Sequence, residues 1–263
     1  MYHEGELAVQ RRAGVAAEAA RVGRIIGDAV PASFAAFLAA REFVIAGTLD
    51  GNGAVTASIL TGGPGFAHAV DPRTLRIEPA GGHRRRVFAD IAADPRIGLL
   101  AIDFAARRRI RVNGIASRDG DALRVAASEV YGNCPQYIAP HDAVTLPPLD
   151  GATSAAALTE EQRAWIESAA TFFIASAHPS AGADVSHRGG QPGFVRAEER
   201  RIVWPDYSGN NMFNTLGNLE VNPRCGLLFL DFERGRTLQL GGRASVVWDG
   251  ESRRIVVDLE TVA

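Results

Sequence analysis

The sequence predicts a mainly β protein with flanking helices (α+β), built from two similar lobes in tandem. Short β-rich runs separated by turn clusters fill the chain from Phe43 onward, and a second series of such runs follows residue 158. The two series contain matching segments at a fixed offset. Because tight turns join neighbouring strands, we expect antiparallel barrels, whose closure removes exposed strand edges.

The bulk composition is that of an ordinary globular protein. The 263 residues are 46% hydrophobic and 22% charged, with a net charge of −2, so no strong field attracts nucleic acid or an anionic membrane. No apolar run approaches the roughly 18–20 residues of a membrane span. Residues 1–12, MYHEGELAVQRR, have no apolar core, so no secretory signal is expected. We therefore expect a cytoplasmic protein without nucleic-acid or membrane partners.

Residue usage excludes several kinds of chemistry. The chain contains no Lys, so all 28 basic residues are Arg, which excludes a Schiff-base lysine and a Walker-type phosphate loop. Cys134 and Cys225 are too few for a disulfide framework or a Cys-based metal site. The six His stand singly, and no metal site is expected. Any bound anion must be held by Arg, backbone N–H groups, hydroxyls or amides.

The first half reads as helices followed by a β-rich lobe, over residues 1–140. An apolar stripe at Val15, Ala19, Val22 and Ile26 predicts a helix, and a second short helix follows Pro31. A further helix is expected over 85–94. Strands are expected over 43–49, 54–60, 75–79, 96–104 and 108–117.

The second half repeats this texture after a linker. Residues 141–157 are rich in Pro and small side chains, which is typical of a linker. Thr159 and Gln162 form a capping box that predicts a helix at the start of the second lobe, residues 158–263. Strands are then expected over 172–177, 183–188, 193–197, 201–206, 225–232, 237–248 and 253–260.

The two halves are copies of one unit. Phe66 and Phe194 close two similar Pro-Gly-Phe turns, and 194 − 66 = 128. Residues 91–104 and 219–232 keep this offset and are identical at 7 of 14 positions, where about one match is expected by chance. A repeat this long with two copies indicates a duplicated domain, and two such lobes can pack face to face as a homodimer does.

The strongest candidate site is the turn between a predicted strand end and a predicted helix, Trp204 to Leu219. Free N–H groups at a helix N-terminus attract phosphate, and Ser and Asn side chains add donors. In the strand before it, Ser186 and Arg188 point to one face, where Arg188 can offer a bidentate fork to an anion. The alternative, a capped helix beside a solvated strand end, stays open.

Several other features are candidates with an open structural alternative. Thr237 and Gln239 share a strand face and could bond to a flat heterocycle, or simply form a polar outer face. Cys134 is either a thiol near a ligand or, as we favour, a small buried residue before Pro135. The remaining candidates are His187, the positive cluster GGHRRR (81–86) with Arg84, Arg85 and Arg86, and Arg107, Arg109 and Arg111 on one strand face.

Three segments of the second half carry a resemblance to a known family: ADVSHRGGQPGFV (183–195), IVWPDYSGNNMFNTLGNLEVNPRCGLLFLDF (202–232) and GRTLQLGGRA (235–244). In this order they resemble the strand, phosphate-turn and flavin-edge segments of the pyridoxamine 5′-phosphate oxidase-like, FMN-binding split β-barrel proteins. The first half is similar too, in YHEGE (2–6), RRRIRVNG (107–114) and EVYGNCPQYI (129–138). The combination resembles the tandem-barrel, predicted flavin-nucleotide-binding branch, some members of which carry a fused ferredoxin-reductase-like module.

The resemblance implies two tandem split β-barrel lobes that form an intrachain pseudo-dimer, with FMN as the cofactor. It implies that Ser186 and Arg188, with His187 beside them, line the phosphate and ribityl side, and that Thr237 and Gln239 face the isoalloxazine edge. The implied phosphate turn comprises Trp204, Pro205, Tyr207, Ser208, Gly209, Asn210 and Asn211.

The departures from the family pattern shape the expected function. True pyridoxamine phosphate oxidases usually carry Arg or Lys where this chain has Asn210 and Asn211, and they end in an Arg- and Trp-bearing tail that this chain lacks. We therefore expect an FMN-dependent oxidoreductase acting on an unidentified small molecule other than pyridoxamine phosphate. The alternative is a non-catalytic flavin, haem or deazaflavin module that exchanges electrons with a separate reductase partner; a homodimer is left open.

The two copies are expected to have diverged. Copy two has Ser186-His187-Arg188 before its Pro-Gly-Phe turn, where copy one has Ser58-Ile59-Leu60. We expect one site, kept mainly on copy-two residues, with the other degraded or repurposed. The rival assignment places the phosphate on Arg84, Arg85 and Arg86.

Overall fold

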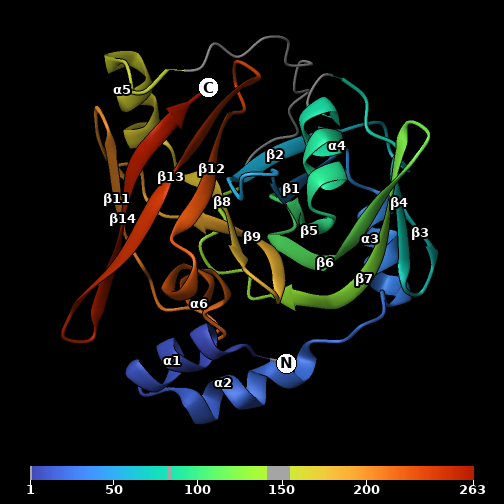
Figure 1. Ribbon diagram of the computed structural model, residues 1–263, viewed down its shortest axis with the longest axis horizontal. Helices are drawn as coiled ribbons and strands as arrows, with labels where there is room; N and C mark the ends of the chain where they lie inside the picture. Colours follow the sequence, from blue (N-terminus) through green and yellow to red (C-terminus); the bar gives the residue numbers. More distant parts are fainter. Residues whose placement is uncertain (1, 82–83, 141–154) are drawn as a thin grey trace.

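Two antiparallel sheets with the same strand order form the body of the protein (Figure 1). The structure, a computed structural model, describes residues 2–81, 84–140 and 155–263. Most of the expected linker, residues 141–154, and Gly82 and His83 of the positive cluster lie outside the described residues.

The first lobe is a seven-stranded sheet in the order β2-β1-β5-β6-β7-β4-β3. Its strands are β1 (Phe43–Leu49), β2 (Val55–Thr61), β3 (Ala67–Asp71), β4 (Thr74–Ile77), β5 (Arg96–Asp103), β6 (Arg108–Asp119) and β7 (Ala122–Asn133). The second lobe has the order β10-β11-β14-β13-β12-β8-β9. Its strands are β8 (Thr171–His178), β9 (Gly182–Gly189), β10 (Arg196–Glu198), β11 (Arg201–Pro205), β12 (Arg224–Asp231), β13 (Arg236–Asp249) and β14 (Ser252–Val262).

Reversing the second order gives β9-β8-β12-β13-β14-β11-β10, which matches the first lobe strand for strand and confirms the duplication. Each lobe is a split β-barrel with its own buried apolar core. Two strands of the first lobe, β3 and β7, were not predicted. β7 is the counterpart of β14, which the sequence did predict.

The helices cover the ends and outer faces of the sheets. They are α1 (Glu4–Arg12), α2 (Ala16–Val22), α3 (Ala32–Ala39), α4 (Arg84–Ala93), α5 (Glu160–Ser168) and α6 (Asn214–Val221), with a 3-10 turn at Gly23–Ile25. The N-terminal stretch differs from the prediction, because Gly14 adopts a positive φ of 70° and separates two helices. α5 begins with the expected capping box of Thr159 and Gln162. No helix in the described part of the chain has the length and apolar character that crossing a membrane requires.

A third apolar core joins the lobes. It includes Ile45, Ile59 and Leu100 from the first lobe and Phe173 and Leu228 from the second. Burial of this shared surface is the main force that holds the pseudo-dimer together.

Two glycines of the repeat allow the lobes to approach. A Cβ on Gly98 would lie 2.6 Å from the carbonyl oxygen of Ala183, and a Cβ on Gly226 would lie 2.6 Å from that of Val55. Since 98 + 128 = 226, the same position in each copy touches the backbone of the other lobe. This contact explains why both copies keep glycine in the Pro-Arg-x-Gly-Leu-Leu strand.

Candidate functional site

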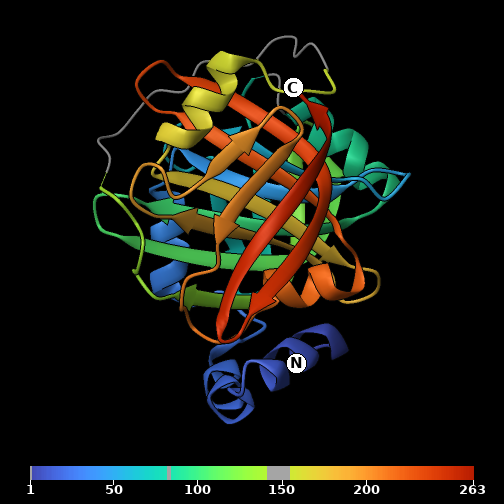
Figure 2. The ribbon, with the colours of Figure 1, turned by 90° about the vertical axis from the view of Figure 1, so that its left-hand side faces the viewer.

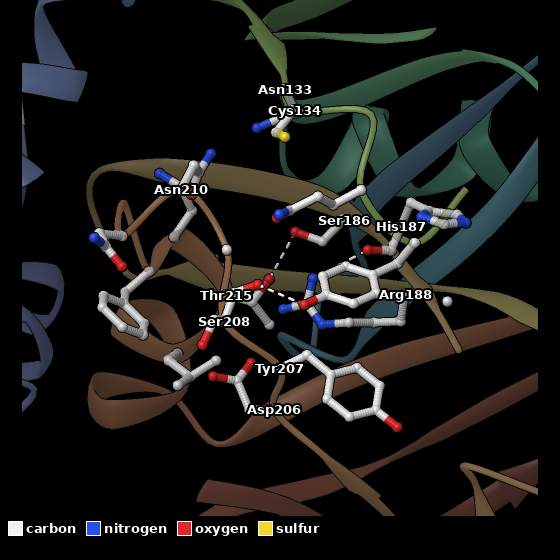
Figure 3. Close-up of a pocket in the computed structure, with 18 of the residues that line it drawn as sticks. Asn133, Cys134, Ser186, His187, Arg188, Asp206, Tyr207, Ser208, Asn210 and Thr215 are labelled. Atoms are coloured by element: carbon white, nitrogen blue, oxygen red, sulfur yellow. Dashed lines mark hydrogen bonds between the residues drawn. The ribbon is translucent and has the colours of Figure 1, made fainter. Parts of the chain in front are cut away.

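A pocket lies at the seam between the lobes (Figure 3). The second lobe contributes the end of β9, the turn after β11 and the start of α6, while the first lobe contributes β6 and the segment after β7. Asn133 and Cys134 of the first lobe face Ser186, Arg188 and Ser208 of the second across it (Figure 3). The cavity volume is about 120 Å³.

Ten of the twelve residues expected from the sequence line this one pocket: Ser186, His187, Arg188, Trp204, Pro205, Tyr207, Ser208, Gly209, Asn210 and Asn211. Thr237 and Gln239 do not line it. Gln239 instead donates to the carbonyl of Ala57 (2.9 Å) and to Ser58 Oγ (3.2 Å), elsewhere along the seam. The strand-face prediction itself is confirmed, because Leu238 and Leu240 are buried in the core.

The turn from Pro205 to Phe213 leads into a helix start without a side-chain cap. Asn211 (φ 62°) and Phe213 (φ 60°) both adopt the left-handed conformation, which is uncommon for residues with a Cβ. Phe213 is the N-cap of α6 and makes no capping hydrogen bond. Asn214, Thr215 and Leu216, the first residues of α6, line the pocket. A helix start without a side-chain cap offers its backbone N–H groups and the positive end of the helix dipole to an anion.

Three guanidinium groups converge on the pocket. Arg111, from β6, donates to Ser186 Oγ and to Tyr131 Oη (3.2 Å), and Ser186 Oγ lies 2.7 Å from Thr215 Oγ1. Arg109 donates to His187 Nδ1 (2.7 Å). Arg188 donates to the carbonyl of His187 (3.2 Å).

Two of these cations are not paired with a carboxylate at ion-pair distance in the described part of the chain. Among the described residues, neither Arg109 nor Arg188 forms an ion pair, whereas Arg111 lies 3.8 Å from Asp184. Burial, with the charges of Arg111 and Arg188, lowers the pKa of Arg109 to about 9. Burial, with the charge of Arg111, lowers the pKa of Arg188 to about 10, and the charge of Asp206 opposes this shift. Both side chains stay charged at neutral pH, and a bound anion would relieve the cost of burying that charge.

Aromatic side chains form one side of the pocket. The rings of Tyr137 and Tyr207 stack with centroids 5.3 Å apart, and Tyr137 Oη donates to the carbonyl of Ser208 (3.0 Å). Cys134 is exposed and lines the pocket, so the expectation of a buried small residue there was wrong. Cys225, by contrast, is buried in the core as expected.

The sequence alone did not assign the first-lobe residues that line the pocket to the site. Arg109 and Arg111 were one alternative for an anion site, and both line the pocket. Arg107 does not share their strand face, because it precedes β6 in a turn with a positive φ of 50°. Asn133, Gln136 and Tyr137 were not proposed as site residues. Their signal lay in the EVYGNCPQYI segment, which had no assigned role.

The rival cationic cluster at α4 is partly neutralised. Arg86 pairs with Asp90 (2.8 Å) and approaches Asp50 (3.5 Å). Arg84 donates weakly to the carbonyl of Pro79 (3.4 Å). These contacts leave the guanidinium of Arg86 less free than those of Arg109 and Arg188.

His3, Glu4 and His178 form a group with metal-ligand spacing among the described residues. Backbone N–H groups donate to Nδ1 of both imidazoles, from Gly5 to His3 and from Ala181 to His178. The proton of each neutral ring therefore lies on Nε2, which donates to Asn218 Oδ1 or to Glu4 Oε1. A metal-binding His has the opposite arrangement, with the nitrogen away from the metal donating, so this group is a hydrogen-bonded contact.

Comparison with known proteins identifies the second lobe. Residues 158–260 match the family model described as pyridoxamine 5′-phosphate oxidase. No curated protein matches the chain in sequence.

Similar solved structures each correspond to about two fifths of this chain. A putative pyridoxamine 5′-phosphate oxidase from Lactobacillus delbrueckii is 12% identical over 41% of this chain and 95% of its own, with a TM-score of 0.35. An F420 reductase is 13% identical over 40% and 98%, with a TM-score of 0.33. The heme storage protein of Vibrio cholerae is 13% identical over 38% and 88%, with a TM-score of 0.30.

Proposed function

From the premise that the second lobe is a pyridoxamine 5′-phosphate oxidase-like domain, we propose that the protein is an FMN-binding oxidoreductase with one flavin in the interlobe pocket. The observation that carries this proposal is the pair of guanidiniums of Arg109 and Arg188, which face the pocket and form no ion pair among the described residues, although the charge of Asp206 acts on Arg188. A phosphate monoester supplies the charge and the acceptor oxygens that they lack.

The donor set fits the phosphorylated end of FMN. Arg188, Arg109 and the start of α6 would hold the phosphate, while Ser186 and Thr215 would bond to the ribityl hydroxyls. Two buried donors, Arg188 Nε and Trp204 Nε1, have no hydrogen-bond partner in the part of the chain that the structure describes, and they add capacity for hydrogen bonds to a ligand. At about 120 Å³, the cavity is smaller than the ~300–1,000 Å³ of pockets that enclose a whole ligand, so it suits this end only.

When bound, FMN would supply hydride or electron transfer. The chain's own residues would hold the ligand and exclude water. Asp206, the lining carboxylate, is already paired with Arg253 at 2.9 Å. His187, Cys134, Tyr137 and Tyr207 also line the pocket and carry a proton that could be transferred. The substrate would be a small molecule other than pyridoxamine phosphate, because Asn210 and Asn211 stand where true pyridoxamine phosphate oxidases usually carry Arg or Lys.

A second candidate is a flavin module without its own substrate, served by a separate reductase. The engagement of Asp206 with Arg253 and of His187 with Arg109 favours it, because neither group is then free to act as an acid or base. Haem or a deazaflavin in place of FMN belongs to this alternative.

The test is the visible spectrum of the purified protein and its titration with FMN. A flavin spectrum with one equivalent bound per chain supports the proposal, whereas a Soret band indicates haem. Absence of FMN uptake contradicts the proposal. Turnover of a reduced nicotinamide with oxygen would then distinguish an oxidoreductase from an electron-exchanging module, which turns over only with an added reductase.

A further inference from the structure

The N-terminal helix α1 precedes the first lobe in sequence but packs on α6 of the second lobe (Figures 1 and 2). Its first turn comes from the segment YHEGE (2–6), to which the function above gives no role. Each residue from His3 to Glu6 makes a different contact with the second lobe. The segment is therefore fitted closely to the lobe that carries the binding turn.

Glu6 contacts a residue of the pocket directly. Its Oε1 accepts from Asn214 Nδ2 at 2.6 Å, and its Oε2 accepts from the backbone N–H of His3 at 2.9 Å. Glu6 is only 5% exposed. Asn214 is the first residue of α6 and lines the pocket. A buried acceptor thus fixes the side chain of a pocket residue from behind.

Backbone contact between the two helices makes this placement rigid. A Cβ on Gly5 would lie 2.2 Å from the carbonyl oxygen of Gly217, and a Cβ on Gly217 would lie 2.5 Å from Cγ of Glu6. Only glycine at both positions permits this approach.

Gln10 holds the binding turn itself. Its Nε2 donates to the carbonyl of Met212 at 3.0 Å, and the side chain is 1% exposed. Met212 stands between Asn211 and Phe213, the two left-handed residues of the turn. Such a backbone conformation persists only where surrounding contacts enforce it. The contact from Gln10 is one of these.

We propose that Glu6 and Gln10 are positioning residues of the ligand site, through which α1 holds Asn214 and Met212 in the geometry that binds the ligand. Docking of α1 and binding in the pocket are therefore coupled, and each strengthens the other. The proposal rests on the proposed function for its choice of FMN as the ligand, and on geometry alone for the ordering of the turn.

Glu4 provides the matched control. It belongs to the same turn of α1 and bonds to His178 Nε2 at 2.9 Å, but its side chain is 72% exposed and neither residue lines the pocket. Glu4→Ala therefore removes a docking contact of α1 without reaching the binding turn.

The experiment compares Glu6→Ala, Gln10→Ala and Glu4→Ala in the full chain. We expect Glu6→Ala and Gln10→Ala to weaken FMN binding roughly tenfold each and to speed amide hydrogen exchange over residues 206–213 of the ligand-free protein. Glu4→Ala should change either quantity less than about twofold. Adding Glu6→Ala to Asn214→Ala should weaken binding no further, because Glu6 acts through Asn214.

Equal effects of the Glu6 and Glu4 variants on exchange and on affinity would overturn the proposal, since they would reveal a general loss of docking. If the unaltered protein does not take up FMN, the proposed function fails, yet exchange over residues 206–213 still decides the inference. If Glu6→Ala does not fold, the comparison of Gln10→Ala with Glu4→Ala tests the proposal instead.

Discussion

The two sides of the interlobe seam have the same architecture and different side chains. On one side Arg111 of β6 donates to Ser186 of β9. On the other, Gln239 of β13 donates to Ser58 of β2 at 3.2 Å. Since 111 + 128 = 239 and 58 + 128 = 186, the two contacts are equivalent positions of the repeat. The crossing of the strands is the same on both sides, with a cation on one side and a neutral amide on the other.

The neighbouring positions differ in the same direction. Thr237 is the counterpart of Arg109, and Leu60 is the counterpart of Arg188. Leu60 is fully buried in the core of the first lobe. One side therefore carries three guanidiniums and the other carries none at these positions. The two sides therefore share one strand crossing and differ in charge at three positions, and this difference would favour an anion on the side with the guanidiniums.

The largest expected effect tests the close contact between the lobes that both sides of the seam share. Gly98→Ala and Gly226→Ala each force a Cβ within 2.6 Å of a backbone carbonyl of the other lobe. We expect each to lower the free energy of unfolding by about 3 kcal/mol, because overpacking against backbone cannot be relieved by a rotamer change. Urea unfolding of both variants measures this. A marked difference between them would break the equivalence of the two sides.

The next effect tests the side chains that differ between the two sides of the seam. Arg188→Ala should weaken FMN binding roughly a hundredfold, since a charge-assisted hydrogen bond contributes about 1.5–3 kcal/mol. Gln239→Ala changes the counterpart of Arg111 on the other side of the seam, and it should change affinity less than about twofold. Titration followed by flavin fluorescence measures both. A larger loss in the Gln239 variant would move the site to the other side of the seam.

The smallest effect concerns the pH dependence of stability, which we attribute to one buried carboxyl group near each side of the seam. Burial raises the pKa of Glu6 to about 7, with Asp184 and Glu129 adding to the shift. Because the folded pKa lies above the unfolded value of 4.5, the stabilising contribution is complete below pH 4.5 and is lost as pH rises through about 7. Unfolding free energies at pH 5 and pH 8 should differ by about 2 kcal/mol more in the unaltered protein than in Glu6→Gln.

Asp90 is the buried acid on the other side, and burial raises its pKa too. Its partners Thr48 (2.6 Å) and Arg86 (2.8 Å) oppose that shift, so Asp90→Asn should alter the pH dependence less than Glu6→Gln does. An equal change in both variants would show that the two sides do not differ in this respect.

Much of the fold was predictable, because the alternating strands are a local pattern and the offset of 128 can be found by comparing the sequence with itself. The ten expected residues that line one pocket come from two short stretches of the second lobe, residues 186–188 and 204–211, so few long-range contacts had to be predicted. The side of the seam that Gln239 faces was not predictable, because it depends on how strands of different lobes cross. The role of Glu6 was hidden for the same reason: its partner Asn214 lies 208 residues away.

That separation has a consequence for how the chain is made. A ribosome that adds roughly 5–20 residues per second completes α1 some tens of seconds before α6 emerges. During that interval the second lobe is not yet complete, so Val9 and Gln10, which are buried in the folded protein, cannot pack against it. α1 is thus among the last helices to settle, although it is made long before α6, and nascent chains halted before α6 should leave it open to protease.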